Sequence, residues 1–423
     1  MTGDFLKPVL LLVPHYMGSL LYFEKLLLGL SEKYEVVFFP LFARHTYFEE
    51  MVGYCRQKNY KIYLVEEPKL PLFVKKIRFI RELIWVGYFK LVVGKLFEKL
   101  AVEKIISVND NSIYVRWLIT EGNKRGIDTM VLQWALFYEG QRLRPPRLVK
   151  NWRRIFYKFG KPVYLFFRKI FRGLILGFDF EGGKFVIGAG PSKRMGVINS
   201  AAKDCFVQAG VPEKKISIVG HPDFYLAEEV MKNLGSSSLE KITVADKYGI
   251  DLSKKNVVFY SSPMYVKDIT VLTPAEQLDY TKRLFTIIRK YLTEKNYDLI
   301  LKIHPLEKAD LYRPVEELGV KIMKKQTNNN ELIFFADLYI ADSTFTNFIP
   351  IAMGKEAIFV NFFNLPSVES AKGCFGIKKF IEAWDEFEKL LELFRDGNLP
   401  RQYEFDEKIL INNSLRKILD WIG

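Results

Sequence analysis

The sequence predicts an α/β fold built from two doubly wound halves, each a parallel sheet covered by helices. Three observations lead to this prediction. The 423 residues exceed what one hydrophobic core usually accommodates. Short apolar runs alternate with helix-length segments along most of the chain. The alternation pauses at Gly235-Ser236-Ser237-Ser238, which is typical of a linker, and then starts again.

Short apolar runs mark the strands of the first half. Val9–Val13 comes first, and it ends in the loop 14–19 before a helical pattern that reaches Leu30. Further strands are expected over residues 35–40, 61–65, 104–108, 129–134, 184–188 and 216–219. Strands that alternate with helices form right-handed βαβ units, so we expect the sheet to be parallel and covered on both faces.

The second half repeats the pattern. A helix is expected to begin after Thr273, because a threonine cap, Pro274 and Glu276 together form a start signal. Strands are expected over 256–260, 298–303, 321–323, 338–340 and 357–361, and helices near 331–336, 381–394 and 407–422. The predicted domains are 1–225 with a basic aromatic insertion at 141–180, then 239–405, then a closing helix at 406–423. We expect the two sheets to face one another across a cleft that holds the active site.

Composition limits the class of protein. Hydrophobic residues make up 49% and charged residues 26%, the balance of a globular protein. The three cysteines are widely scattered and predict neither a disulfide framework nor a zinc site, as expected for a reducing cytosol. The chain contains no Asp-x-Asp triplet of the kind that chelates a metal, no apolar stretch of about 20 residues, and no export signal, so we expect a cytoplasmic protein without a metal.

A histidine follows a buried strand in the second half. The segment Leu299–Pro305 reads as a strand that ends at His304-Pro305, with Lys302 two residues earlier. An imidazole at the carboxyl edge of a sheet can donate to a phosphate oxygen, and it can become charged when the phosphate arrives. The alternative is a histidine that only satisfies a loop carbonyl.

Hydroxyl groups follow a second strand end. The strand at 338–340 leads into Asp342-Ser343-Thr344, and a helix is expected to begin at once. Ser343 or Thr344 would cap that helix, and the helix start would then attract an anion. Capping alone explains such residues in most proteins. Because His304 is expected at a neighbouring strand end, we interpret the pair as a site for a diphosphate or a phosphodiester.

These motifs resemble those of a known group of enzymes. Lys302-x-His304-Pro305 and Asp342-Ser343-Thr344 are similar to motifs of GT-B transferases of bacterial surface-polysaccharide synthesis, which include capsule proteins, sialyl- and Kdo-transferases and teichoic-acid glycerophosphotransferases. Residues 207–222 resemble the interdomain crossover of that group and of UDP-GlcNAc 2-epimerases. The resemblance implies a GT-B fold and a CMP-, CDP- or UDP-linked donor held by Lys302, His304, Pro305, Ser343 and Thr344. It implies no tightly bound cofactor.

The resemblance also implies where a general base would lie. Residues 108–111 resemble the strand-end Asp of the epimerases, and residues 132–142 lie where the transferases carry Leu-Gln-His-Gly; Trp134 replaces that histidine here. Glu139, Asp110 and His15 are then the candidates to take the proton of the acceptor hydroxyl. Each of them could instead be a loop residue that hydrogen-bonds its neighbours. Asn347 stands where many GT-B enzymes carry an acidic ribose ligand, so the nucleotide is left open.

The positive charge is concentrated in the first half. The formal net charge is +14, and residues 141–172 contain many Lys and Arg, interleaved aromatics and no acidic residue. A second stretch, 72–99, has a similar pattern. Basic amphipathic helices with aromatic residues suit an anionic membrane surface. The alternatives are an apolar face that is core, and binding of a single-stranded nucleic acid, which no recognised motif supports.

The sequence therefore predicts a peripheral enzyme at the inner face of the plasma membrane. It would transfer a sugar from a nucleotide-activated donor to a lipid-linked glycan or polysaccharide. Three alternatives stay open: a polyol-phosphate transferase that uses CDP-glycerol, a nucleotide-sugar 2-epimerase, and a non-catalytic nucleotide-binding subunit.

Overall fold

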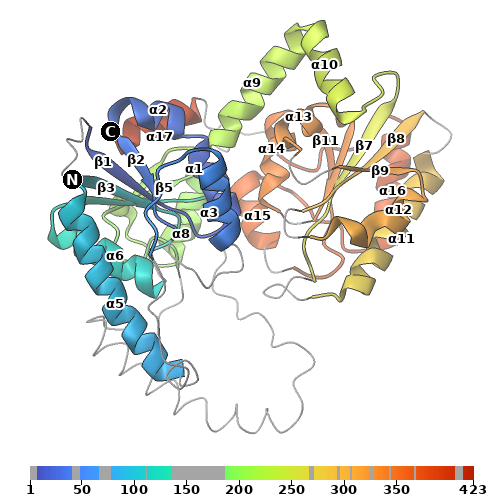
Figure 1. Ribbon diagram of the computed structural model, residues 1–423. Helices are drawn as coiled ribbons and strands as arrows, with labels where there is room; N and C mark the ends of the chain where they lie inside the picture. The colour runs from blue at the N-terminus through green and yellow to red at the C-terminus, as the bar shows by residue number, and fades with distance from the viewer. Residues whose placement is uncertain are drawn as a thin grey trace, which may run out of the picture.

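The computed structural model describes residues 7–40, 48–65, 78–110, 112–134, 186–265, 271–292, 296–304, 307–323, 327–342, 344–365, 368–404 and 413–423. Their strands form two parallel sheets, each covered by helices (Figure 1). The predicted α/β class with two Rossmann-like halves is thereby confirmed.

The N-terminal sheet has the strand order β2-β1-β3-β4-β5-β6, and every adjacent pair is parallel. Its strands are β1 Val9–Val13, β2 Glu35–Phe38, β3 Val102–Ser107, β4 Asp128–Leu132, β5 Arg194–Val197 and β6 Ile216–Ile218. The chain moves from β1 to β2 on one side and to β3 on the other. The switch point, where ligands bind in such sheets, therefore lies between the carboxyl ends of β1 and β3.

Helices cover both faces of this sheet, so the side chains of β1 alternate between two cores. Leu10 and Leu12 pack into one cluster, and Val9, Leu11 and Val13 pack into the other. The covering helices are α1 Met17–Glu24, α2 Leu27–Lys33, α3 Phe48–Gln57, α5 Arg78–Lys99, α6 Ile113–Lys124, α8 Ser200–Gln208 and α17 Ser414–Ile422, with the 3-10 turn η1 Glu213–Lys215 before β6. The closing helix α17 thus packs against the N-terminal half, where Ile418 and Ile422 join the cluster of Leu10 and Leu12.

Two strands of the N-terminal half differ from their prediction. The expected strand at 61–65 contributes only one bridge, between Ile62 and Phe38. The expected strand at 184–188 was wrong where it is described, because residues 187 and 188 form a turn in which Gly188 has a φ of 86°. The strand of that region is β5, whose sequence Arg-Met-Gly-Val lacks an apolar run. Gly196 is needed there, since a Cβ would lie 2.7 Å from Leu132.

The C-terminal sheet has the order β11-β10-β7-β8-β9, and every pair is again parallel. Its strands are β7 Lys255–Tyr260, β8 Tyr297–Lys302, β9 Val320–Met323, β10 Leu338–Ala341 and β11 Glu356–Phe359. Its helices are α11 Pro274–Leu292, α12 Arg313–Glu316, α13 Asn329–Phe334, α14 Phe348–Ala352, α15 Val368–Phe375 and α16 Trp384–Arg395, with 3-10 turns η2 Ala309–Tyr312 and η3 Phe345–Asn347. The predicted capping box of α11 is confirmed by two hydrogen bonds between Thr273 and Glu276, of 2.7 and 3.2 Å.

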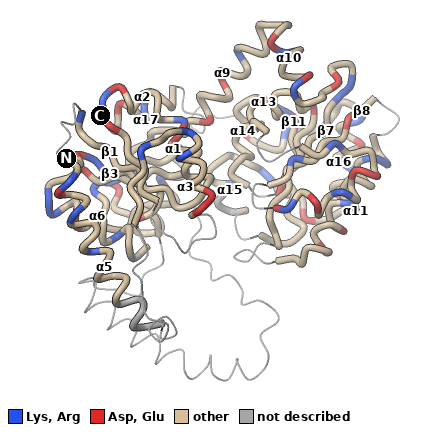
Figure 2. The backbone as a smooth tube through the Cα atoms, in the orientation of Figure 1, with Lys and Arg blue, Asp and Glu red and all other residues tan. Residues whose placement is uncertain are grey.

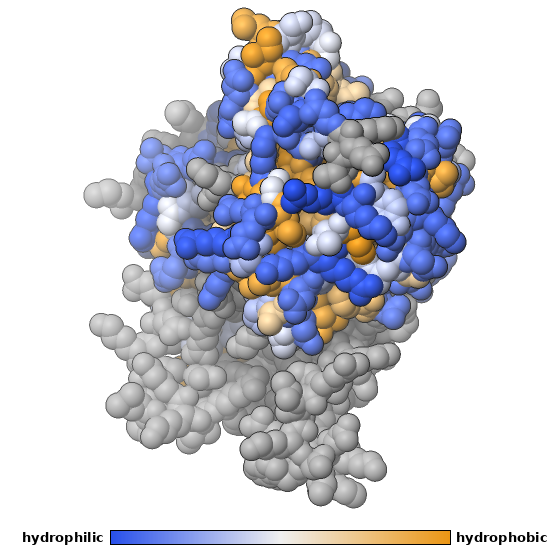
Figure 3. Space-filling model, turned by 90° about the vertical axis from the view of Figure 1, so that its right-hand side faces the viewer, coloured by the Kyte–Doolittle hydropathy of each residue, from blue (hydrophilic) through white to orange (hydrophobic). Residues whose placement is uncertain are grey.

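The predicted linker is a corner between two helices. α9 spans Pro222–Ser236 and α10 spans Ser238–Tyr248, and the hydroxyl of Ser237 caps α10 by accepting from the N–H of Glu240 at 3.3 Å. The serine run thus ends one helix and starts the next. The two helices form a projecting hairpin (Figure 1), and apolar side chains at its tip, among them Leu239, face solvent (Figure 3).

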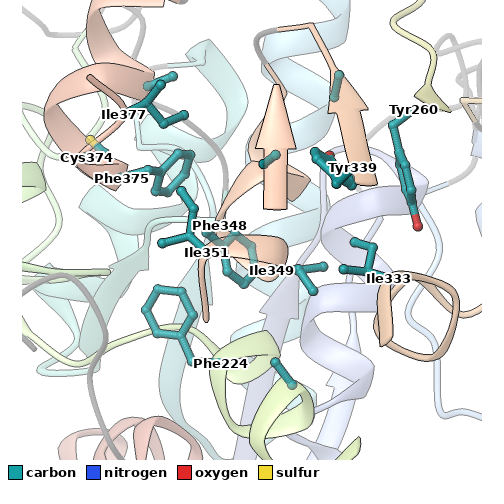
Figure 4. Packing of buried hydrophobic residues seen from close by; sticks show 14 of the residues in the cluster. Phe224, Tyr260, Ile333, Tyr339, Phe348, Ile349, Ile351, Cys374, Phe375 and Ile377 are labelled. Atoms are coloured by element: carbon teal, nitrogen blue, oxygen red, sulfur yellow. The ribbon is translucent and has the colours of Figure 1, made fainter. Parts of the chain in front are cut away.

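One apolar core runs across the junction of the two halves. Phe224 of α9 makes an edge-on contact with Phe348 of α14, with ring centroids 4.8 Å apart. Phe348 also lies against Phe375 of α15, as Figure 4 shows. The same cluster includes residues from both sheets, such as Met195 and Tyr339. The two halves are therefore packed together through aromatic side chains.

Candidate functional site

The C-terminal sheet has its switch point between β7 and β10. From β7 the chain builds outward to β8 and β9, and only later adds β10 and β11 on the other side. Ligands in open parallel sheets bind beyond the carboxyl ends of the strands at such a point. Ser261 and Ser262 follow β7, and Asp342 follows β10. The sequence predicted a role for the motif that contains Asp342, whereas no pattern pointed to the two serines.

His304 follows β8, on the other side of β7. Its backbone N–H donates to Ser261 Oγ at 3.0 Å and to Glu307 Oε2 at 2.9 Å. The imidazole is half-buried at the carboxyl edge of the sheet, where the sequence analysis expected it. The hydrogen bond from the His304 backbone to Ser261 thus joins the loop after β8 to the loop after β7.

The strand ends that carry His304 and Thr344 are not direct neighbours. Tyr260 of β7 pairs with Lys302 of β8 on one side and with Ala341 of β10 on the other. β8 and β10 are therefore about 10 Å apart, two strand spacings. The prediction that these two strand ends are adjacent was therefore wrong, because β7 lies between them. The serines of the β7 loop occupy the middle of the site and connect its two sides.

Glu307 holds this loop system together. It is fully buried, and one carboxylate oxygen accepts from the Ser261 hydroxyl as well as from His304 N–H. The other oxygen accepts from the hydroxyl of Tyr312 at 2.5 Å. A buried carboxylate needs such partners to offset its loss of water. Sequence reasoning missed Glu307, although its place three residues after His304 was visible.

Asp342 is a second buried carboxyl group at this edge. Its Oδ1 accepts from the Tyr280 hydroxyl at 3.0 Å, while its Oδ2 is buried without a hydrogen-bond partner. Burial raises the pKa of Asp342 to about 8, and the neighbouring charge of Glu307 adds to the shift. Asp342 is therefore mainly protonated at neutral pH. The site thus contains two buried carboxyl groups, of which Asp342 is mainly neutral.

Lys302 is buried at the end of β8. Its side chain has 3% of its surface exposed, and Nζ donates to the carbonyl of Ile303 at 3.3 Å. The amino group thus lies within the sheet edge, where low dielectric strengthens its effect on nearby anions. Pro305 and Ser343, the other two predicted ligands in this half, lie outside the described residues.

The helix start after β10 differs from its prediction. The chain enters the 3-10 turn η3 before the short helix α14, and Thr344 makes no capping hydrogen bond to a backbone N–H. Its hydroxyl accepts from Thr346 at 3.4 Å. The expected anion site at a capped helix start is therefore not formed by Thr344. Asn347 fastens this loop instead, donating to the carbonyl of Asp342 at 2.9 Å.

The N-terminal candidates lie at the other switch point. His15 follows β1, and its backbone N–H donates to Ser19 Oγ at 2.9 Å, which closes the β1–α1 loop. Trp134 packs against this loop: a Cβ at Gly18 would lie 2.9 Å from its ring. Trp134 thus fills space beside the β1–α1 loop. Glu139 lies outside the described residues.

Asp110 is fully buried and holds the loop before β5. Its Oδ1 accepts from Gly188 N–H at 2.8 Å, its Oδ2 accepts from the Ser192 hydroxyl at 2.7 Å, and Lys215 Nζ lies 3.6 Å from Oδ2. A Cβ at Gly190 would collide with the Asp110 carboxyl group. Both oxygens are thus engaged within the protein. This arrangement matches the loop-residue interpretation of Asp110.

A buried histidine connects the two halves. His221 follows β6, its Nδ1 accepts from Asp223 N–H at 3.2 Å, and its ring centroid lies 4.9 Å from Tyr22 of α1 and 4.7 Å from Phe345 of η3. Burial lowers the pKa of His221 to about 3, so the ring is neutral. The first helix of one half and the loop after β10 in the other thus meet at this ring.

The predicted membrane-binding stretches lie only in part within the described residues. In α5, Trp85, Phe89, Val93 and Leu96 are buried in a core cluster, so the interpretation of 72–99 as a membrane-facing surface was wrong for these residues. Residues 141–172 lie outside the described part. Elsewhere basic and acidic residues are interspersed (Figure 2). No described helix is long and apolar enough to cross a bilayer, and no described cluster of His, Cys, Asp or Glu could hold a metal ion.

Comparison with known proteins places the fold. Neither a family model nor a curated protein sequence matches this chain. Among solved structures, the UDP-GlcNAc 2-epimerase of Neisseria meningitidis bound to UDP-GlcNAc superposes with a TM-score of 0.57 at 10% identity, covering 98% of this chain and 99% of that one. The epimerase of Methanocaldococcus jannaschii gives 0.57 at 12% identity, and that of Rickettsia bellii gives 0.54 at 12%, each covering 98% of this chain and 99% and 98% of theirs. The chain therefore shares the GT-B fold of these enzymes.

Proposed function

We propose that this chain is a metal-independent glycosyltransferase that moves a sugar from a nucleotide-activated donor to a membrane-associated acceptor, a lipid-linked glycan or a polysaccharide. The observation that carries the proposal is the polar edge of the C-terminal sheet. There the ends of β7, β8 and β10 bring together Ser261, Ser262, His304 and Asp342 at a switch point. Such an edge suits the phosphates of a nucleotide.

The donor phosphates would lie over the β7 loop, between His304 and Thr344. His304 donates to a phosphate oxygen, and binding of the anion favours its charged form. Buried Lys302 adds positive charge from below, and Asp342, being mainly protonated, does not repel the phosphates. Ser343 and Pro305 retain their predicted role as neighbours of the phosphates. The positive charge stabilises the nucleotide as it leaves.

The acceptor hydroxyl needs a base from the N-terminal half. His15 and Glu139 remain the candidates, while the hydrogen bonds of Asp110 fit a structural role. Removal of a general base commonly costs a factor of 10² to 10⁴, roughly, in turnover. Separate His15→Ala and Glu139→Gln variants, assayed at saturating donor, would identify which of the two takes the proton.

The proposal is tested by transfer assays with purified protein, acceptor-bearing vesicles and a panel of CMP-, CDP- and UDP-linked donors. We expect His304→Ala to lower turnover by about a hundredfold, as loss of one charge-stabilising donor commonly does. Lys308→Ala is the matched control, because its side chain is exposed in the same loop. Wild-type turnover in the His304 variant would remove the donor-site assignment.

A 2-epimerase is the second candidate, favoured by the extent of the structural similarity to enzymes of that activity. It would convert UDP-GlcNAc without any acceptor, so incubation of protein and UDP-GlcNAc alone, followed by NMR of the sugar, separates the two. CDP-glycerol in the donor panel tests the polyol-phosphate alternative. Absence of both transfer and donor hydrolysis would instead indicate a nucleotide-binding subunit.

A further inference from the structure

Two cysteines meet where the halves of the chain pack together. Cys205 lies on α8 of the N-terminal half, and Cys374 lies on α15 of the C-terminal half, next to Phe375 (Figure 4). The two helices are fastened at this point, because Asn199, which caps α8, donates from Nδ2 to the carbonyl of Cys374 at 2.6 Å. The thiols therefore belong to different sheets but share one interface.

The two thiols interact where α8 and α15 meet. The thiol of Cys374 hydrogen-bonds to that of Cys205. The backbone beside Cys374 approaches the same sulfur, since a Cβ at Gly373 would lie 3.8 Å from Cys205 Sγ. A disulfide requires the two β-carbons to lie about 3.5–4.5 Å apart and the two α-carbons about 4.4–6.8 Å apart.

The two thiols also differ in exposure, as the attacking and resolving cysteines of a reactive pair do. Cys205 is partly exposed, whereas Cys374 is fully buried, and both are reduced. The hydrogen bond from Cys374 lowers the pKa of Cys205 to about 7, against the opposing effect of burial. Cys205 is thus substantially a thiolate at neutral pH, the form that reacts with oxidants. Burial instead raises the pKa of Cys55 to about 11, so that cysteine serves as an internal control.

We propose that Cys205 and Cys374 form an oxidative modification site, in which a peroxide converts the pair into a reversible disulfide between the two halves. The Cys205 thiolate attacks one peroxide oxygen, the O–O bond breaks, and a sulfenic acid and water are formed. Cys374 then attacks the Cys205 sulfur and displaces the hydroxyl as water. Two thiols lose two electrons and two protons, and one hydrogen peroxide becomes two waters.

The crosslink fixes α8 against α15. These helices flank the aromatic core that joins the halves, so the bond holds the two sheets in the arrangement seen here. Thiol reductants, such as a dithiol or glutathione, reverse it by exchange. The inference does not depend on the proposed enzyme activity, because it concerns only the contact between the halves.

The test uses the full-length protein treated with a stoichiometric amount of hydrogen peroxide, then alkylated and digested without reductant. Mass spectrometry should find a peptide that links Cys205 to Cys374, with Cys55 still alkylated, and dithiothreitol should release it. The link should persist in Cys55→Ser and be absent from Cys205→Ser. Oxidation of Cys205 to the sulfinic acid with Cys374 free, or a link only between separate molecules, would overturn the proposal.

A second measurement can be made first on the wild-type protein. The rate at which iodoacetamide alkylates Cys205 in the wild type should rise with pH around a midpoint near 7. Cys374→Ala removes the hydrogen bond and should raise that midpoint by more than one pH unit. A wild-type midpoint at 9 or above would show that the two thiols are not in contact.

Discussion

At the scale of single residues, the candidate site depends on Glu307. Its carboxylate accepts from Ser261, His304 and Tyr312, and these partners come from three different loops and turns. Only the contact with Ser261 joins segments distant in the chain, and no local sequence pattern predicts it, whereas His304 and Tyr312 lie within five residues of Glu307. The positions of Lys302 and His304 could be predicted, because both lie at the end of a strand that the apolar segment starting at Leu299 indicates.

Glu307→Ala should destabilise the protein by about 3 kcal/mol, because three buried donors lose their acceptor. Glu307→Gln should cost less than half of that, since an amide oxygen can accept from Ser261 and His304 while Tyr312 accepts from the amide. Urea unfolding of the two variants beside the wild type gives both values. Equal stability of all three proteins would contradict the role assigned to Glu307.

Asp342 should make stability depend on pH. Its folded pKa of about 8 lies above the ordinary value of 3.8, so the folded state holds its proton longer than the unfolded state. Its contribution is complete below about pH 4, falls by up to about 1.4 kcal/mol per pH unit as pH rises toward 8, and then levels off.

Asp342→Asn removes that titration. The stability of the variant relative to wild type should therefore rise steadily between pH 5 and pH 8, measured by denaturant unfolding at each pH. Asp310→Asn, an exposed substitution in the same half, is the control and should show no such trend. A constant difference between Asp342→Asn and wild type would mean that Asp342 is already ionised at pH 5.

At the scale of elements, alternating apolar runs predicted most strands, and the capping box predicted the start of α11. The prediction failed where tertiary contacts override local pattern. β5 contains Arg194, whose guanidinium reaches Asp128 and the carbonyl of Trp421 rather than the core. The linker 235–238 is a helical corner because Ser237 serves as the end of one helix and the cap of the next.

The junction at the start of α9 should be sensitive to acid. His221 has a folded pKa of about 3 and an ordinary value of 6.5, so the unfolded state binds a proton that the folded state excludes. Its contribution is complete above about pH 6.5 and is lost progressively as pH falls toward 3. His221→Asn, which can still cap α9, should flatten the loss of stability between pH 6 and pH 4.5. A variant that keeps the full acid dependence would assign it to other groups.

At the scale of the whole molecule, the excess positive charge remains the argument for a membrane surface. The described part of 72–99 contributes its aromatic residues to the core, so residues 141–172 carry that prediction alone. Each basic residue near an anionic surface contributes about 1 kcal/mol. Charge reversal by Arg153→Glu and Arg154→Glu should therefore weaken sedimentation with phosphatidylserine vesicles by more than a hundredfold, with little change for neutral vesicles. Retained binding would exclude this segment as the membrane contact.

The central claim is that the carboxyl ends of β7, β8 and β10 bind the phosphates of a nucleotide. Calorimetric titration of wild type and His304→Ala with CMP, CDP, UDP and GDP tests it most directly. The account predicts that one nucleotide binds the wild type with a defined stoichiometry, and that the variant binds it at least tenfold more weakly. If no nucleotide binds, or if both proteins bind with equal affinity, the assignment of this sheet edge is contradicted.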